Sequence, residues 1–236
     1  MNNDNVNPQL KEAVDEIMRT KGITDVNLAY PHVALQNVRK GKKTFQWHIV
    51  TLLACVVYIY GRIAADSNWK LLLMCFSYWA IETIAEQINA LVFYFTKKAP
   101  LWCTPGHNSA YVIYIGLNIE ITFMFGIAAA VCGLILPENH WDTFLAIPIN
   151  VWIPFGIGVF CLFVETLLNK VDSLTWYWPI WNRKMLLFCF IGYSGAFVLF
   201  VQVYLRAQIE TAAILCAVSV AVAALSHIIF TKRKMI

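Results

Sequence analysis

Three polar side chains stand at helical spacing within one long apolar stretch, "MCFSYWAIETIAEQINALVFYF", which runs from Met74 to Phe95. They are Glu82, Glu86 and Asn89, and steps of four and three residues place them on one side of an α-helix. Neighbouring carboxyl groups in a low dielectric cannot all be ionised, so at least one should hold a proton at neutral pH. A carboxylic acid beside a carboxylate that can take a proton back is typical of general acid and base catalysis.

Two further apolar stretches carry side chains of the same kinds, Glu120 with Asn118 and Glu165 with Asn169. A charged residue at the bilayer centre costs roughly 2.5 to 3.5 kcal/mol on insertion scales, so four glutamates need a functional reason. We expect Glu82 near the bilayer centre, Glu120 about 15 Å in from the cytoplasmic side, and Glu165 at the cytoplasmic boundary. These positions predict one dry chamber that is shared by the four glutamates and opens, if at all, towards the cytosol.

Aromatic and amide side chains on the same stretches could line this chamber. Trp79 lies between Cys75 and Glu82 on the polar stripe, and Trp152 lies in the stretch that ends with Glu165. Aromatic faces stabilise cations, which suits a reaction that passes through a carbocation. The predicted catalytic residues are Glu82, Glu86, Glu120 and Glu165, and the predicted substrate-binding residues are Trp79, Asn89, Asn118, Trp152 and Asn169.

Six apolar runs must position these side chains. They are residues 45–65, 71–95, 110–136, 143–168, 185–205 and 211–230. Each is long enough for a helix to cross a hydrocarbon layer of about 30 Å. Backbone amides in lipid need internal partners, so the runs are predicted to be helical. With 59% hydrophobic and 14% charged residues, the chain is predicted to be an all-α, polytopic membrane helix bundle of about six transmembrane helices.

The basic residues predict the orientation of this bundle. They precede the first run, follow the second, separate the fourth from the fifth and close the chain: Arg39, Lys40, Lys42, Lys43, Lys97, Lys98, Lys170, Arg183, Lys184, Lys232, Arg233 and Lys234. By the positive-inside rule both termini are cytoplasmic, which requires an even number of spans. The net charge of +4 therefore indicates topology and not binding to nucleic acid. The first apolar run begins too late for a cleavable signal peptide, so we expect the inner membrane of a bacterium or the endoplasmic reticulum of a eukaryote.

The chain divides into a cytoplasmic segment (1–44), a transmembrane bundle (45–231) and a basic cytoplasmic tail (232–236). In the first segment, "NPQLKEAVDEIMRTKG" predicts a helix with Asn7 as N-cap and Gly22 as its stop. Its apolar face is expected to lie on the membrane surface or to cover the cytoplasmic mouth of the bundle. A solvated helix without such a contact is the alternative.

The cysteines, one histidine and a group of tryptophans are the remaining candidates for a role in chemistry. The cysteines show no CxxC or Cys/His spacing, so neither a disulfide framework nor a metal site is predicted, and no cofactor is expected. His107, in the loop "PLWCTPGHNSAY", is the histidine best placed to contact the cytoplasmic mouth. Trp176, Trp178 and Trp181 are more typical of an aromatic belt at the membrane interface than of a substrate site.

The segment "CFSYWAIE", residues 75–82, resembles the span that carries a tryptophan and a glutamate in small integral-membrane terpene cyclases of fungal meroterpenoid and indole-diterpene pathways. The resemblance implies a helical membrane enzyme that protonates an isoprenoid epoxide, with Glu82 as the acid. Here Ala80 and Ile81 separate Trp79 from Glu82, and the last span has no carboxyl group to match the family's second acid. The emopamil-binding type of sterol isomerase is a looser analogy, and both imply acid and base work on isoprenoid-derived lipids.

We therefore expect an integral membrane enzyme for cyclisation or isomerisation of an isoprenoid or other apolar lipid, with membrane lipids as its surroundings and no nucleic-acid partner. A proton-coupled transporter or channel with an intramembrane glutamate relay is the alternative. The outer half of the bundle has no acidic residues and the chain no repeat symmetry, which favours the enzyme. A scaffold held by interhelical hydrogen bonds is a third interpretation, and the sequence leaves the oligomeric state open.

Overall fold

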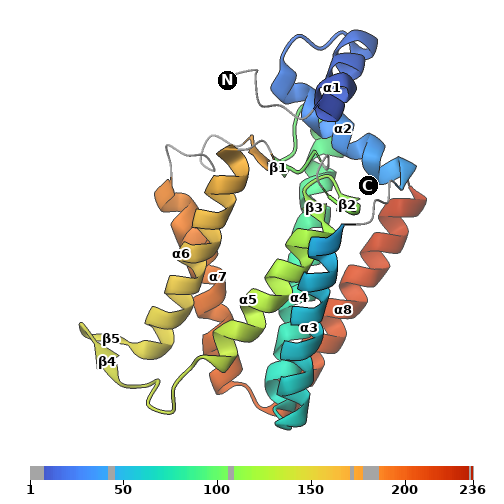
Figure 1. The fold of residues 1–236 in the computed structure, drawn as a ribbon. Helices are drawn as coiled ribbons and strands as arrows, with labels where there is room; N and C mark the ends of the chain where they lie inside the picture. The colour runs from blue at the N-terminus through green and yellow to red at the C-terminus, as the bar shows by residue number, and fades with distance from the viewer. Residues whose placement is uncertain are drawn as a thin grey trace.

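The apolar runs form helices, as their length and composition predict. The computed structural model describes residues 8–41, 46–105, 109–170, 173–177, 186–233 and 235, without the side chains of residues 186, 188 and 189. Within these residues the fold is an all-α bundle (Figure 1). Its helices are α1 (Pro8–Lys21), α2 (Val26–Lys40), α3 (Trp47–Ala65), α4 (Trp69–Thr96), α5 (Ile119–Leu134), α6 (Ile149–Lys170), α7 (Leu186–Arg206) and α8 (Ile209–Lys232).

Short antiparallel strand pairs shape three of the connections between helices. Strand β1 (Trp102–Cys103) pairs with β6 (Thr175–Trp176), and β2 (Val112–Tyr114) pairs with β3 (Leu117–Asn118). Strand β4 (Thr143–Phe144) pairs with β5 (Ile147–Pro148). The first pair joins segments that follow two different helices, α4 and α6.

The strand pairs correct the predicted starts of two spans. The span expected from residue 110 begins as a helix only at Ile119, because β2 and β3 form a hairpin first and the Asn118 side chain then caps α5. Its Oδ1 accepts a hydrogen bond of 2.9 Å from the backbone N–H of Ile121. The span expected from residue 143 begins as a helix only at Ile149, since β4 and β5 form a tight turn with positive φ at Leu145.

Within the described residues, α3, α6 and α8 are long and apolar enough to cross a membrane. Helix α5 and residues 190–206 of α7 are shorter apolar helices. Helix α4 is 28 residues long, but Glu82, Glu86, Gln87 and Asn89 lower its hydropathy. Successive helices from α3 to α8 alternate in direction in Figure 1. This arrangement agrees with six helices, α3 to α8, that cross the membrane and leave both chain ends on one side. The crossing itself stays a prediction.

The bundle consists of two groups of helices (Figure 1). In the first, which we call the four-helix group, α4 packs along α8 and against α5 and α3. In the second, the α6–α7 pair, the two helices pack along each other. The pair interrupts the four-helix group in the sequence, because the chain leaves that group after α5 and returns to it with α8.

The two groups contact each other through α4 and α7, through α5 with both α6 and α7, and through the β1–β6 pair. Tyr78 of α4 stacks on Phe197 of α7, with ring centroids 5.3 Å apart, and meets the edge of Phe200. Towards the other end of the bundle, the β1–β6 pair places Trp102 opposite Trp176. A space remains between the groups, and Tyr78 and Trp102 both line it.

Helices α1 and α2 cover the end of the bundle at which α4 ends (Figure 1). The buried face of α1, including Leu10 and Ile17, belongs to one apolar cluster with Phe93 of α4 and Cys103 of β1. Helix α1 therefore packs on the bundle, and its place over a cytoplasmic mouth stays a prediction. Gly22, with φ +65°, follows α1 as the predicted stop. Asn7 lies outside the described residues.

Gly158 allows α6 to approach α7 closely. A Cβ at this position would lie 2.5 Å from Ser194 Cα and 2.6 Å from Ser194 N, whereas a Cβ at Gly156 would meet nothing within 4 Å. Gly158→Ala is therefore expected to lower the free energy of unfolding by about 1 to 3 kcal/mol, because backbone must move. Gly156→Ala should leave it unchanged or raise it, since alanine favours helix by about 0.5 to 1 kcal/mol. Thermal unfolding of both purified variants tests this, and equal stabilities would contradict it.

Candidate functional site

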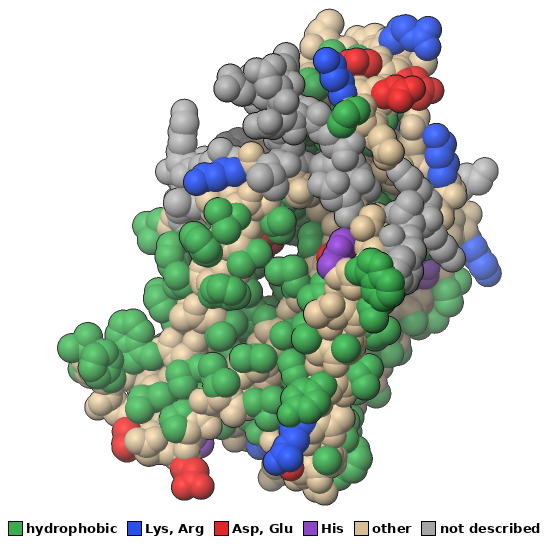
Figure 2. All heavy atoms as spheres, viewed as in Figure 1, with side chains coloured by type: hydrophobic (Ala, Val, Ile, Leu, Met, Phe, Trp, Pro, Cys, Tyr) green, Lys and Arg blue, Asp and Glu red, His purple; other side chains and the backbone are tan. Residues whose placement is uncertain are grey.

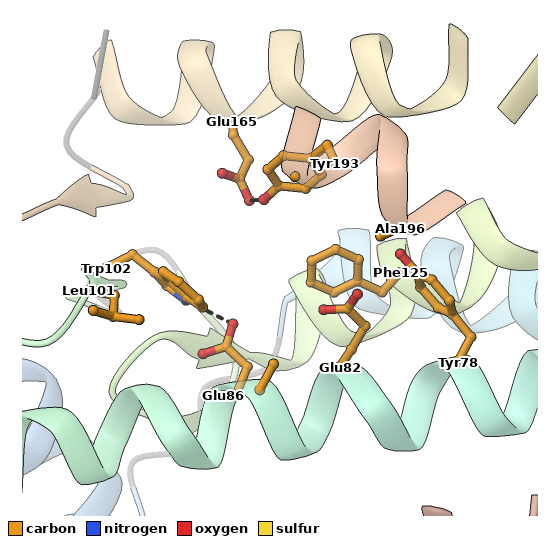
Figure 3. A pocket seen from close by; sticks show the side chains of 11 residues that line it. Tyr78, Glu82, Glu86, Leu101, Trp102, Phe125, Glu165, Tyr193 and Ala196 are labelled. Atoms are coloured by element: carbon orange, nitrogen blue, oxygen red, sulfur yellow. Dashed lines mark hydrogen bonds between the residues drawn. The ribbon is translucent and has the colours of Figure 1, made fainter. Parts of the chain in front are cut away.

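A cavity of about 340 Å³ lies between the four-helix group and the α6–α7 pair. Three carboxyl groups face it, those of Glu82 and Glu86 on α4 and of Glu165 on α6 (Figure 3). Glu82 and Glu86 are one helical turn apart, so they share a face of α4. Tyr78, one turn before Glu82, lines the same wall. The structure thus brings together three of the four glutamates that the sequence singled out.

Glu86 is buried and held by a loop that follows α4. The Trp102 indole N–H donates a hydrogen bond of 2.9 Å to Glu86 Oε1, and the Asn89 side-chain amide lies 3.5 Å from Oε2. Asn89 also holds this loop in place. Its Oδ1 accepts from the backbone N–H of Leu101 at 2.7 Å, and its Nδ2 donates to the carbonyl of Trp102 at 2.9 Å. Asn89 therefore positions Trp102 over Glu86.

The turn between β2 and β3 packs directly onto this contact. A Cβ at Gly116 would lie 2.5 Å from Glu86 Oε2 and 2.7 Å from Trp102 Cδ1, and still closer to the Asn89 amide. Real Cβ atoms do not approach other atoms so closely, so only glycine fits at this position without a shift. The contacts around Glu86 therefore require glycine at position 116.

The opposite wall of the cavity carries Glu165 with Tyr193 of α7. The Tyr193 hydroxyl donates a hydrogen bond to Glu165 Oε1 (Figure 3). Trp176, the strand partner of Trp102, has a buried indole nitrogen without a hydrogen-bond partner in the described structure. Glu82 turns its carboxyl group into the cavity between these walls (Figure 3).

A second cavity, of about 310 Å³, adjoins the first. Phe125, Glu165 and Tyr193 line both cavities. The remaining lining of the second cavity is apolar and comes mainly from α5 and α6, with Ile121, Met124, Ile157, Phe160, Val164 and Leu168 among its residues. Figure 2 shows the apolar face of the molecule hollowed between α5 and the α6–α7 pair. An apolar chain that lies here would reach the carboxyl groups with one end.

Glu120 lies apart from the cavity, in the first turn of α5. Its carboxylate accepts hydrogen bonds from Ser109 Oγ at 2.6 Å and from the backbone N–H of Ala110 at 2.8 Å. It also lies 3.0 Å from Nε2 of His48 on α3. The late start of α5 at Ile119 puts Glu120 in the first turn of the helix, and its depth of about 15 Å in the membrane stays a prediction. Glu120 thus connects the start of α5 to the loop at Ser109 and Ala110 and to His48 of α3.

None of the five predicted substrate-binding residues lines the 340 Å³ cavity. Asn118 caps α5, and Asn169 donates from Nδ2 to the carbonyl of Leu174 at 2.9 Å. The Trp152 indole donates to the carbonyl of Phe144 at 2.7 Å, near the other end of α6. Trp79 packs against Tyr60 and Phe123 within the four-helix group, and Asn89 acts through Trp102 as described above. His107, Trp178 and Trp181 lie outside the described residues.

Sequence reasoning missed two residues of the site, Trp102 and Tyr193. Trp102 stands in a loop, and nothing in its local sequence indicates that the loop folds back onto α4. Tyr193 could have been noticed because it and Ser194 are among the few polar side chains of an apolar span. Gln87 was also missed. It is buried and donates from Nε2 to the Ala223 carbonyl of α8 at 2.9 Å, which joins helices within the four-helix group.

The arrangement can hold and exchange protons. Among the described residues, no three His, Cys, Asp or Glu side chains come close enough together to hold a metal ion. The described lining of the cavity contains carboxyl, phenol and indole groups and no Lys, Arg or His. These groups can donate or accept protons and present aromatic faces to a bound molecule.

Comparison with known proteins places the chain among membrane proteins. A family model described as "Uncharacterized membrane protein family" matches residues 29–232. An uncharacterized protein of Archaeoglobus fulgidus is 37% identical over 161 residues, which is 68% of this chain and 76% of that relative. No solved structure matches the chain. The matched residues 29–232 include the three glutamates of the cavity.

Proposed function

The chain belongs to this family of uncharacterized membrane proteins, and we propose that it is an integral membrane enzyme that moves protons on an apolar lipid substrate. One observation carries the proposal: Glu82, Glu86 and Glu165 face a single cavity that adjoins an apolar one. Burial of three carboxyl groups in a membrane bundle is unfavourable, so their convergence favours a functional role.

The substrate that best suits the two cavities is an isoprenoid or a similar lipid. Its apolar chain would lie between α5 and α6, where the lining is almost wholly apolar. Its reactive carbon atoms would lie beside Phe125 and Tyr193, which line both cavities, and near Trp102. Aromatic faces at these positions would stabilise a carbocation. The head of the substrate should carry no negative charge, because carboxylates would repel it.

The proposed reaction begins with proton transfer from Glu82 to an alkene or epoxide of the substrate. In an alkene, the π electrons form the new C–H bond and the other carbon becomes a cation. In an epoxide, the C–O electron pair stays on the protonated oxygen and the carbon becomes a cation. The carbocation then rearranges or cyclises. A base then removes a proton from a neighbouring carbon, and the C–H electron pair forms the new double bond. We assign the base to Glu86, because its carboxyl group faces the same cavity one helical turn from Glu82 and is held in place by the hydrogen bond from Trp102. The substrate gains one proton and loses one, and the proton on Glu86 then returns to Glu82, one helical turn away, so the enzyme is restored and no co-reactant is consumed.

Aromatic packing at one end of the cavity favours an enzyme over a transporter. A proton-coupled transporter needs polar access from both membrane faces. Here Tyr78 packs against Phe197 and Phe200 at one end of the cavity. A closed aromatic end suits a reaction chamber that excludes water from a carbocation.

Lipid extracts of expressing cells test this proposal. Cells that produce the wild-type chain are compared by mass spectrometry with cells that produce Glu82→Gln. A matched control is Glu210→Gln, which removes an exposed carboxylate at the start of α8. We expect an isoprenoid or other apolar lipid whose level changes with the wild-type and control chains but not with Glu82→Gln. Identical lipid profiles, together with proton flux in liposomes that depends on Glu82, would replace the enzyme by the transporter.

A further inference from the structure

Another pocket, of about 230 Å³, lies where α1 and α2 meet the end of α4. Basic side chains from three separate elements line it, Lys21 of α1, Arg39 of α2 and Lys97, which follows α4. Its wall also contains apolar and aromatic residues, including Phe93 and Tyr94. It shares no lining residue with the carboxyl cavity.

Among the described residues, no carboxylate compensates the positive charge of this pocket. No Asp or Glu is among its lining residues, and none of its three cations forms an ion pair with a carboxylate in the described part of the chain. Lys97 Nζ lies 3.8 Å from the centre of the Tyr94 ring, which holds the ammonium group at the rim. Cations gathered from three elements repel one another, so an anion between them would be bound strongly.

His32 supports this view of the pocket. It also lines the pocket, and burial together with the charge of Lys21 lowers the pKa of its imidazole. It is therefore neutral at pH 7 and can act as a hydrogen-bond donor or acceptor beside the cations. The fixed charge of the pocket comes from Lys21, Arg39 and Lys97.

The position of the pocket indicates the chemistry of its ligand. It lies at the end of α4 that is predicted to face the cytoplasm, and the exposed ring of Phe95 packs against the pocket residue Tyr94. Anionic lipid headgroups are concentrated at the cytoplasmic surface of membranes, and basic pockets beside spanning helices bind them. Aromatic and aliphatic walls beside the cations suit the glycerol end of such a lipid.

We propose that this pocket binds the phosphate group of an anionic lipid headgroup. The proposal is independent of the chemistry in the carboxyl cavity. Each cation near an anionic headgroup contributes about fivefold in affinity, so removal of three should weaken binding about 100-fold.

Native mass spectrometry of the full chain in detergent tests the pocket. The probes are phosphatidylglycerol, phosphatidic acid and the zwitterionic phosphatidylcholine, and soluble glycerol 3-phosphate is added as a competitor. The test variant carries Lys21→Gln, Arg39→Gln and Lys97→Gln. The matched control carries Lys11→Gln, Lys40→Gln and Lys98→Gln, which removes the same charge from exposed positions on α1, at the end of α2 and after α4.

We expect the test variant to lose binding of both anionic lipids about 100-fold, whereas the control variant keeps it within about threefold of wild type. If glycerol 3-phosphate displaces the lipids at concentrations similar to theirs, the pocket binds a soluble phosphate compound and not a lipid. Equal lipid binding by the test and control variants would overturn the proposal, as would equal affinity for phosphatidylcholine. Thermal unfolding of the two variants separates loss of binding from loss of fold.

Discussion

Turnover in the purified protein is expected to fall about 1000-fold when Glu82 is replaced by Gln, with lipid binding unchanged. Glutamine keeps the size and the polarity of the side chain, but it has no acidic proton to give. General acid catalysis by a positioned side chain contributes about 100- to 10,000-fold, so its loss should appear in kcat and not in KM. The measurement is the steady-state conversion of the lipid identified in cell extracts, with the thermal midpoint as the check on folding.

Glu120→Gln and Glu210→Gln are the matched controls for this result. Glu120 holds Ser109, Ala110 and His48 outside the cavity, so its replacement should lower the thermal midpoint and leave kcat within about threefold. Glu210 is exposed at the start of α8, so both quantities should stay unchanged. Full turnover by Glu82→Gln, or its loss in Glu120→Gln alone, would remove the reaction from the cavity between the two groups of helices.

Gly116→Ala is expected to disable the site although Gly116 has no side chain that could take part in the reaction. The added methyl group would overlap Asn89 and press on Glu86 and Trp102, with 2.5 Å to Glu86 Oε2. Overpacking of this kind lowers the free energy of unfolding by about 1 to 3 kcal/mol. Displacement of a catalytic group by about 1 Å can reduce the rate about 100-fold. We therefore expect both a lower thermal midpoint and a kcat reduced about 100-fold.

Gly195→Ala provides the comparison, because a Cβ on this α7 glycine would meet nothing within 4 Å. It should leave turnover and stability near wild type. The fluorescence of the protein adds a direct readout, since a shift of the Trp102 indole away from Glu86 changes its surroundings. Wild-type kcat in Gly116→Ala would mean that the hydrogen bonds around Glu86 are not needed for the reaction.

The helical content and the convergence on α4 could be predicted because both follow from local patterns. Apolar length predicts the helices, and the spacing of Glu82 and Glu86 places them on one face whatever the tertiary structure. Glu165 could be added because carboxyl groups in apolar stretches turn towards the interior of a bundle. These inferences required no knowledge of loops.

The rest of the site could not be predicted because it depends on contacts between distant segments. Trp102 reaches Glu86 only because Asn89 binds the loop backbone, and Tyr193 reaches Glu165 only through the packing of α7 on α6. Glu120 was predicted to lie well inside a long helix, but apolar residues before Ile119 form a hairpin, so it lies in the first turn of α5. Hydropathy does not distinguish these two structures when the strands are short.

The place of the α6–α7 pair in the sequence has a consequence for how such a protein can change. The pair is a contiguous insert between α5 and α8, and it supplies Glu165 and Tyr193 as one wall of the cavity. Recombination at its two flanks could graft a different hairpin onto a constant scaffold that already holds Glu82 and Glu86. A new pocket shape would then arise in one exchange, with the proton-handling residues of α4 inherited intact.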